Sequence, residues 1–127
     1  MAYLLDTHTL LWALSGDEYL SGKARALIVN LDNECYVSIA SLWEITIKHS
    51  LGSLDLKMSL LDFFAIVERT GFTELPLSKE HLTVLNDLPF HHRDPFDRVI
   101  ISQGIHEGLT IITKDRMIAT YDIKVVW

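Results

Sequence analysis

The sequence predicts an α/β protein, a three-layer α/β/α sandwich around a mostly parallel central sheet of about five short strands. Short apolar runs alternate along the chain with longer stretches of helical periodicity, the pattern of parallel sheets that are covered by helices. Of the 127 residues, 49% are hydrophobic and 22% are charged, a composition typical of folded chains. Since no repeat, low-complexity tract or linker interrupts this pattern, we expect a single domain over residues 1–127.

The predicted strands are apolar runs that are too short for helices and mostly rich in β-branched or aromatic residues. The first and the fourth show this pattern most clearly. In chain order, the strands are Tyr3–Asp6, Glu34–Ser38, Phe72–Leu75, Thr110–Thr113 and Lys124–Val126.

Helices are expected between these strands, and several have recognisable start and stop signals. Ser59 and Ser78 are suitable N-caps, and Asp94 is followed by proline at the first helical position. Gly71 and Gly108 suit helix ends. The predicted helices are Thr7–Leu14, Gly22–Leu31, Ile39–Leu51, Leu60–Thr70, Lys79–Leu88 and Pro95–Glu107, with a short turn after Asp115.

Four acidic residues are predicted to meet at one edge of this sheet. Right-handed crossovers bring the carboxyl ends of parallel strands to the same edge, where ligands of such folds bind. Asp6 ends the first strand and Asp115 follows the fourth. Glu44 and Asp97 lie in the early turns of helices, and helical side chains lean toward the N-terminus. All four carboxylates should therefore point toward this edge.

Each of these acids also has an ordinary structural role available to it. Asp6 and Asp115 can cap the helical segments that follow them, and Glu44 can pair with Lys48 four residues later. These roles do not explain the convergence of four like charges, which must be spread out, partly protonated or neutralised by a cation. A divalent metal is the simplest explanation.

The ligand chemistry indicates which metal and which reaction. Carboxylate oxygens without cysteine favour Mg²⁺ or Mn²⁺, which keep several waters and bind phosphate substrates. Such ions activate water and stabilise charge on the attacking and leaving oxygens of a phosphodiester. The sequence therefore predicts metal-dependent phosphoester hydrolysis.

Four segments of the chain carry a resemblance to a known family. They are Leu4–Trp12, Ser38–Ile45, Asp94–Gln103 and Thr110–Asp115. In this order and spacing they resemble the PIN domain, and within that family the VapC-like ribonuclease toxins of type II toxin–antitoxin systems. The resemblance implies a PIN-like fold and a Mg²⁺- or Mn²⁺-dependent endoribonuclease. It also implies a homodimer and a small antitoxin whose C-terminal segment occupies the active-site groove.

The resemblance assigns the acidic cluster to the same four residues. Asp6 and Asp97 are expected to be the principal metal ligands, with Glu44 holding a ligand or a metal-bound water. Asp115 would complete the cluster or a second metal site. Thr7 and Thr113 are expected to supply supporting hydroxyls, whereas Asp94 is expected to cap its helix.

Histidine and basic residues also lie near the acids. Many family members have Asn or Ser where this chain has His8, so the part His8 plays in orienting Asp6 is open. His91 and His92 have no third ligand at the spacing of a transition-metal site, and we expect a polar loop near the substrate. Four basic side chains can either contact phosphates or, for two of them, pair with neighbouring acids: Arg93, Arg98, Lys114 and Arg116.

Composition also bears on compartment and partners. The lone cysteine, Cys35, cannot form an internal disulfide, and no segment has the pattern of a signal peptide or a membrane span, so a cytoplasmic protein is expected. We expect Trp12, Trp43 and the Phe63–Phe64 pair to belong to the core rather than to an interaction surface. The formal net charge of −6 disfavours nonspecific RNA binding, but cations at the acidic cluster would reverse the local field.

Two other functions remain open from the sequence. Asp6 after a first strand, with Lys114 late in the chain, resembles the haloacid-dehalogenase-like phosphotransfer enzymes, although His8 stands where their second aspartate belongs. The chain could also be a non-catalytic binding module of PIN fold that uses its acids only as caps or for a basic partner.

Overall fold

The central sheet of the computed structural model, which describes residues 1–127, has five strands that are all parallel. Its strands are β1 (Ala2–Leu5), β2 (Glu34–Ser38), β3 (Thr73–Leu75), β4 (Thr110–Ile112) and β5 (Val125–Val126). They are arranged in the order β3-β2-β1-β4-β5. The predicted α/β class is therefore confirmed, and each strand lies at its predicted place.

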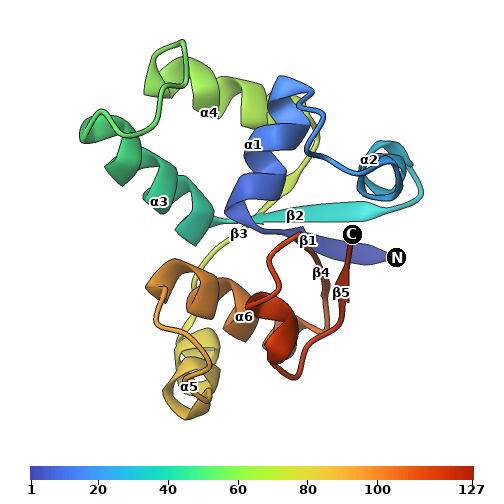
Figure 1. The fold of residues 1–127 in the computed structure, drawn as a ribbon, viewed down its shortest axis with the longest axis vertical. Coiled ribbons are helices and arrows are strands. Elements are labelled where there is room, and N and C mark those ends of the chain that lie inside the picture. Colours follow the sequence, from blue (N-terminus) through green and yellow to red (C-terminus); the bar gives the residue numbers. More distant parts are fainter.

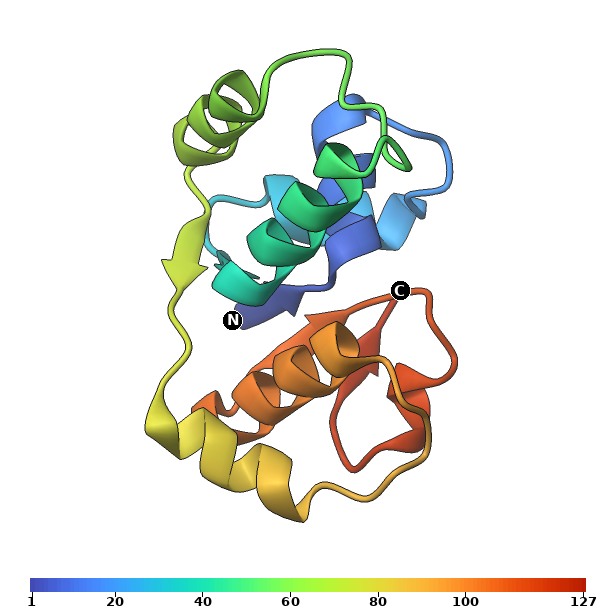
Figure 2. The same cartoon turned by 90° about the vertical axis from the view of Figure 1, so that its left-hand side faces the viewer.

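Helices cover both faces of the sheet (Figures 1 and 2). α1 to α4 lie on one side, and α5 and α6 lie on the other. The helices are α1 (Thr7–Ser15), α2 (Gly22–Val29), α3 (Ile39–Ser50), α4 (Leu60–Arg69), α5 (Lys79–Asp87) and α6 (Pro95–Glu107). A 3₁₀ turn, η1 (Ile118–Thr120), follows β4 where the sequence predicts a short turn. None of the helices is long and apolar enough to span a bilayer.

The core consists of apolar side chains that alternate between the two faces of the central strands. Leu4 and Ile111 pack with α6, whereas Leu5 and Ile112 pack on the other face beside α2. Cys35 is buried on that second face, as expected of a small apolar side chain. A further cluster joins α1, α3 and α4. Both faces of β1 are therefore buried, which is why its sequence is a continuous apolar run.

The aromatic residues are distributed differently from the prediction. Phe63 is buried, and Phe64 and Trp12 are partly buried. Trp43 is 58% exposed, so the expectation that it belongs to the core was wrong. It lies on the outward side of α3 and meets Phe96 edge-to-face, with a centroid distance of 5.1 Å. This contact joins the N-terminal turns of α3 and α6, which carry Glu44 and Asp97.

Gly104 marks the closest approach of α6 to the sheet. A Cβ at this position would lie 3.1 Å from Ile123 Cδ1 and 3.3 Å from Ile111 Cδ1. We expect Gly104→Val to lower the free energy of unfolding by about 1–3 kcal/mol through overpacking, measured by urea denaturation. Gly22→Val is the matched control, because nothing lies within 4 Å of a Cβ built there. Equal stability of the two variants would contradict this account of the packing.

Candidate active site

Asp6 is a buried carboxylate at the carboxyl end of the central strand β1. Its Oδ1 accepts a hydrogen bond from the backbone N–H of Thr9 at 2.9 Å and so caps α1. Its Oδ2 accepts from the hydroxyl of Thr113, directly after the neighbouring strand β4. The same hydroxyl accepts a hydrogen bond from the N–H of Asp115 at 3.0 Å. Thr113 thus connects two of the predicted site acids.

Glu44 is buried in the second turn of α3 and is held at both oxygens. Thr7 Oγ1 donates to Oε1 at 2.7 Å, and Lys48 Nζ donates to Oε2 at 2.7 Å. Thr7 is the first residue of α1, so this contact ties α1 to α3 at the carboxyl edge of the sheet. Lys48 provides Glu44 with the positive partner that its i,i+4 spacing predicts.

Asp97 lies in the first turn of α6, and its Oδ2 is 3.1 Å from His92 Nε2. Its backbone N–H donates to Asp94 Oδ1, which also accepts from the N–H of Phe96. Asp94 is therefore the N-cap of α6, as the sequence predicts. This arrangement leaves the side chain of Asp97 free of capping.

The electrostatics of Asp6 and Asp97 show that buried negative charge gathers at this edge. Burial raises the pKa of Asp97 to about 6, against the lowering effect of its hydrogen bond with His92. The negative charges of three further acids add to the rise: Asp94, Asp115 and Asp6. Burial also raises the pKa of Asp6, although the hydrogen bonds from Thr113 and Thr9 oppose it. Neither carboxylate is paired with a lysine or arginine.

The carboxylates are each held by hydrogen-bond donors and do not form a ready-made metal centre. No group of three His, Cys, Asp or Glu side chains has an arrangement that could hold an ion. The donor set nevertheless fits a hard cation, because it consists of carboxylate and hydroxyl oxygens. A positive ion would also relieve the repulsion that raises the pKa of Asp97.

An open cavity of about 390 Å³ brings several of the predicted residues together. Asp6 and Asp115 line it, together with the predicted basic contacts Lys114 and Arg116. His8 and Trp12 complete the lining, and their rings stack at a centroid distance of 5.4 Å. Glu44 and Asp97 do not line this cavity. Lys48 contacts Glu44 but not Asp97, and its pKa is raised mainly by the hydrogen bond with Glu44, with smaller effects of the negative charges of Glu44, Asp94 and Asp97.

Arg98 is buried, so its side chain is not available for a direct phosphate contact, one of the two roles that the sequence left open for it. It is 4% exposed, and its Nη1 and Nη2 donate to the carbonyl oxygens of Pro89 and Leu88. The guanidinium also lies over the ring of Phe90, 3.9 Å from the centroid. It makes no ion pair with Asp94. Carbonyl oxygens of the backbone therefore satisfy the guanidinium inside the protein.

Sequence reasoning did not identify Lys48 and Tyr121 as parts of the site, and it placed His92 in a polar loop near the substrate without its contact with Asp97. Lys48 was visible only as an i,i+4 partner of Glu44. The position of His92, five residues before Asp97 in the loop that leads into α6, was a weak signal. Tyr121 is 29 residues beyond His92, and its hydroxyl is 2.9 Å from His92 Nδ1. No sequence pattern predicts that contact.

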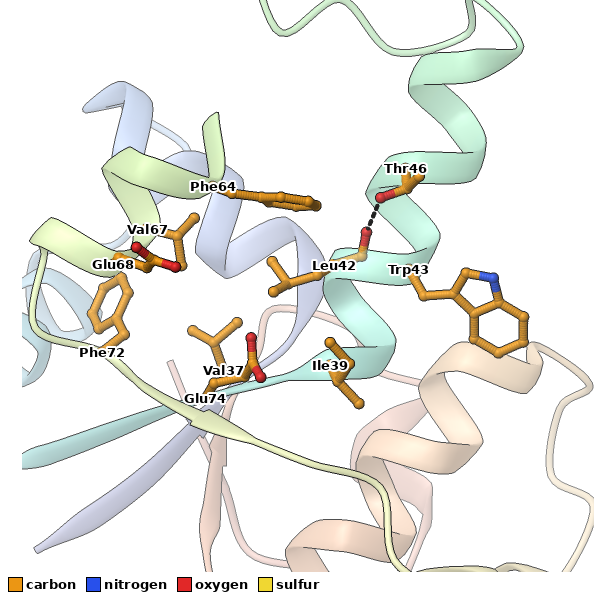
Figure 3. A pocket seen from close by; sticks show the side chains of 10 residues that line it. All are labelled: Val37, Ile39, Leu42, Trp43, Thr46, Phe64, Val67, Glu68, Phe72 and Glu74. Atoms are coloured by element: carbon orange, nitrogen blue, oxygen red, sulfur yellow. Dashed lines mark hydrogen bonds between the residues drawn. The ribbon is translucent and has the colours of Figure 1, made fainter. Parts of the chain in front are cut away.

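Two apolar hollows lie on either side of α3. Figure 3 shows one of about 260 Å³, where Leu42 of α3 faces Phe64 of α4 and Val37 of β2, with Trp43 turned away to one side. None of the four predicted acids lines it. The other, of about 480 Å³, lies between α1, α3, α4 and residues 53–58, and its lining includes Thr7, His8 and Lys48. None of the four acids lines the second hollow, but it adjoins the open cavity, since His8 and Trp12 line both.

The fold and the site together define an α/β protein with a fully parallel sheet and an acidic carboxyl edge. The chain belongs to the PIN domain family, whose model matches residues 3–124. Members of this family are typically nucleases. None of the curated proteins compared with the chain matches it.

Solved structures of similar fold come from bacterial VapBC and related complexes. One is VapBC2 from Rickettsia felis, bound to a DNA fragment from its promoter. It has a TM-score of 0.72 at 18% identity, and the match covers 100% of this chain and 99% of that chain. DNA-bound VapBC from Salmonella typhimurium has a TM-score of 0.70 at 16% identity. The match covers 99% of this chain and 97% of that chain. A toxin–antitoxin complex from Klebsiella pneumoniae has a TM-score of 0.68 at 16% identity. The match covers 98% of this chain and 96% of that chain. This likeness extends over nearly the whole fold.

The raised pKa of Asp97 predicts a pH-dependent cost to the metal-free fold. A carboxyl group with a pKa of about 6 in the folded state and 3.8 as its ordinary value binds its proton more tightly when folded. The tighter proton binding stabilises the folded state. This stabilisation is fully present below pH 3.8 and is lost as the pH rises through 6 and the carboxyl ionises. Asp97→Asn should therefore raise the free energy of unfolding at pH 7 by about 1–3 kcal/mol in EDTA.

Urea denaturation at a series of pH values checks this expectation. The gain from Asp97→Asn should shrink toward pH 4, where the wild-type carboxyl is protonated. Asp122→Asn, at an exposed position near the opposite edge of the sheet, is the control. A gain that is independent of pH, or shared by the control, would contradict the assigned cause.

Proposed function

We propose that this chain is a Mg²⁺- or Mn²⁺-dependent endoribonuclease that acts as the toxin of a toxin–antitoxin pair. The observation that carries this proposal is the gathering of acids from separate elements at the carboxyl edge of a parallel sheet. The pKa of Asp97 is raised mainly by burial, and the negative charges of Asp94, Asp115 and Asp6 add to the rise, although Asp6 and Asp115 come from other parts of the chain. A PIN domain with this charge distribution suits a cation and a phosphate substrate.

The contacts of each acid at this edge suggest its role in the proposed reaction. Asp6 and Asp97 would hold the ion, since neither has a lysine or arginine partner. Glu44, held by Thr7 and Lys48, would orient a ligand or a water. Asp115 would complete the cluster from the cavity that it lines with Asp6. When bound, Mg²⁺ or Mn²⁺ supplies water activation and charge stabilisation during phosphodiester hydrolysis.

Substrate contacts in this proposal come from the same cavity. Lys114 and Arg116 are exposed on its wall beside Asp115, so their charges are available to phosphates of RNA. Thr113 would keep Asp6 in place through its hydroxyl. Because the chain as a whole is acidic, with a formal net charge of −6, selectivity for RNA would depend on shape and on these few cations.

RNA cleavage tests the enzyme assignment. The purified chain should cut RNA into fragments in Mg²⁺ or Mn²⁺ and not in EDTA. Asp6→Asn and Asp97→Asn should each lower the cleavage rate by more than about 100-fold, since even residues that only support metal ligands contribute about 10- to 100-fold. Asp122→Asn should cleave at the wild-type rate. Metal-dependent cleavage that persists unchanged in both site variants would refute the assignment.

A non-catalytic PIN-fold binding module is the alternative that the same acids allow, because Asp6 does cap α1. Such a module would cleave no RNA and would bind Mn²⁺ no more tightly as wild type than as Asp97→Asn. The haloacid-dehalogenase-like alternative predicts an aspartyl-phosphate intermediate at Asp6. Membership of the PIN domain family favours the nuclease over that second alternative.

For the biological role, we propose an antitoxin partner and a homodimer. The apolar hollow between α1, α3 and α4 reaches the acidic edge at Thr7 and His8, which suits a partner segment that covers the site. Trp43, exposed near that edge, is an apolar side chain that a second subunit could bury. The molar mass of the purified chain in solution tests the dimer.

Expression in a bacterial host tests the toxin role. The wild-type chain should arrest growth, and co-expression of the adjacent gene product should relieve the arrest. Asp6→Asn should permit normal growth at the same protein level, because the arrest depends on the acidic site. Arrest by Asp6→Asn, or no arrest combined with intact cellular RNA, would contradict a ribonuclease toxin.

A further inference from the structure

A chain of hydrogen bonds runs from the buried Arg98 to Asp97 through two other side chains. Arg98 Nη1 donates to Tyr121 Oη at 3.0 Å. Tyr121 Oη is 2.9 Å from His92 Nδ1, and His92 Nε2 is 3.1 Å from Asp97 Oδ2. Arg98 and Asp97 are neighbours in α6, so this series of hydrogen bonds begins and ends on the same helix. The function derived above does not use this arrangement.

Counting donors and acceptors at Tyr121 fixes the direction of its own proton. The phenolic oxygen accepts from Arg98 Nη1 at 3.0 Å and from the backbone N–H of His92 at 3.1 Å. Two accepted bonds use both lone pairs of the oxygen, so it cannot accept a third, and in any further hydrogen bond its O–H is the donor. The nearest acceptor is His92 Nδ1 at 2.9 Å, since the carbonyl oxygen of His92 lies farther away at 3.4 Å.

This direction determines which nitrogen of His92 carries the hydrogen. A ring nitrogen that accepts a hydrogen bond has no hydrogen of its own, so Nδ1 is bare. The neutral imidazole therefore has its hydrogen on Nε2, where it points at Asp97 Oδ2. The other oxygen of that carboxylate, Oδ1, makes no hydrogen bond in the structure.

We infer that His92 is a positioning residue for the metal-binding carboxylate of Asp97, held in its Nε2–H tautomer by Tyr121. This inference rests on the proposed function for the metal and on hydrogen-bond geometry for the tautomer. The Nε2–H donor fixes Asp97 by Oδ2 and leaves Oδ1 without a hydrogen bond, so that Oδ1 would be available to a cation. Supporting donors of this kind orient metal ligands in proteins.

Arg98, the first residue in this series of hydrogen bonds, is itself held firmly in place. Its guanidinium is buried and also donates to the carbonyl oxygens of Leu88 and Pro89, which begin the loop that carries His92. The loop, Tyr121 and α6 are thereby fixed to a single group. A buried cation also polarises the O–H of Tyr121, which strengthens the next hydrogen bond in the series. The position of His92 relative to Asp97 is therefore set by contacts with a buried group.

The tautomer can be measured directly. Two-bond ¹H–¹⁵N correlations of the imidazole ring in the metal-free protein should show the Nε2–H form of His92. Tyr121→Phe, which removes the hydroxyl and keeps the ring, should abolish this preference. His91→Ala is the matched control, because exposed His91 packs edge-to-face on the Tyr121 ring without joining the hydrogen bonds. An Nδ1–H form in the wild-type protein would overturn the inference.

Calorimetry with Mn²⁺ measures the positioning effect. His92→Ala should weaken Mn²⁺ binding by about 10- to 100-fold, and His91→Ala should leave it unchanged. His92→Gln, whose amide N–H₂ can donate to Asp97, should restore much of the affinity. Excess Mn²⁺ should also recover part of the RNA cleavage lost in His92→Ala, because this variant weakens the ion site without removing a ligand. Thermal unfolding of each variant shows whether it remains folded.

The outcomes separate this inference from the proposed function. Wild-type affinity for Mn²⁺ in folded His92→Ala would overturn the positioning role and leave the nuclease assignment intact. A wild-type protein that binds no Mn²⁺ would refute the proposed function and the metal part of this inference together. The tautomer would still be decided by the NMR measurement alone.

Discussion

The burial of the Asp6 carboxylate is the constraint on which the rest of the site depends. Asp6 ends the central strand, caps α1 through the N–H of Thr9 and accepts the hydroxyl of Thr113 beyond β4. These bonds compensate for only part of the cost of burying a charge, since the pKa of Asp6 is still raised. The edge is therefore built to hold more negative charge than its own donors neutralise, and a cation is the natural complement.

Structural and functional roles are combined in the same acids rather than divided between them. Asp6 is an N-cap, and Glu44 is half of an ion pair with Lys48. Asp97 is different, because Asp94 provides the cap of α6 and leaves the Asp97 side chain to His92. Among the four acids, Asp97 contributes least to holding the fold together, and its pKa is raised to about 6. Such a residue costs stability, which is typical of a group retained for function.

Local patterns made much of this structure predictable. The strand runs and the N-caps Ser59, Ser78 and Asp94 located nearly every element within two residues, because periodicity and capping act over a few positions. The edge positions of Asp6 and Asp115 followed from strand ends. The burial of Arg98 and its contact with Tyr121 did not, since they depend on how a loop packs against a distant turn. Exposure of Trp43 was missed because helical spacing alone does not show which apolar side of α3 faces the core.

The strand order has a consequence for when this site can exist. The chain builds β1, β2 and β3 outward in one direction, then returns to add β4 and β5 on the other side of β1. Asp6 and Glu44 belong to the first half, whereas Asp97 and Asp115 belong to the second. A nascent chain that has emerged only through α4 contains two of the four acids and lacks the strand that supplies Thr113. The complete edge therefore forms only after nearly the whole polypeptide has been synthesised and folded.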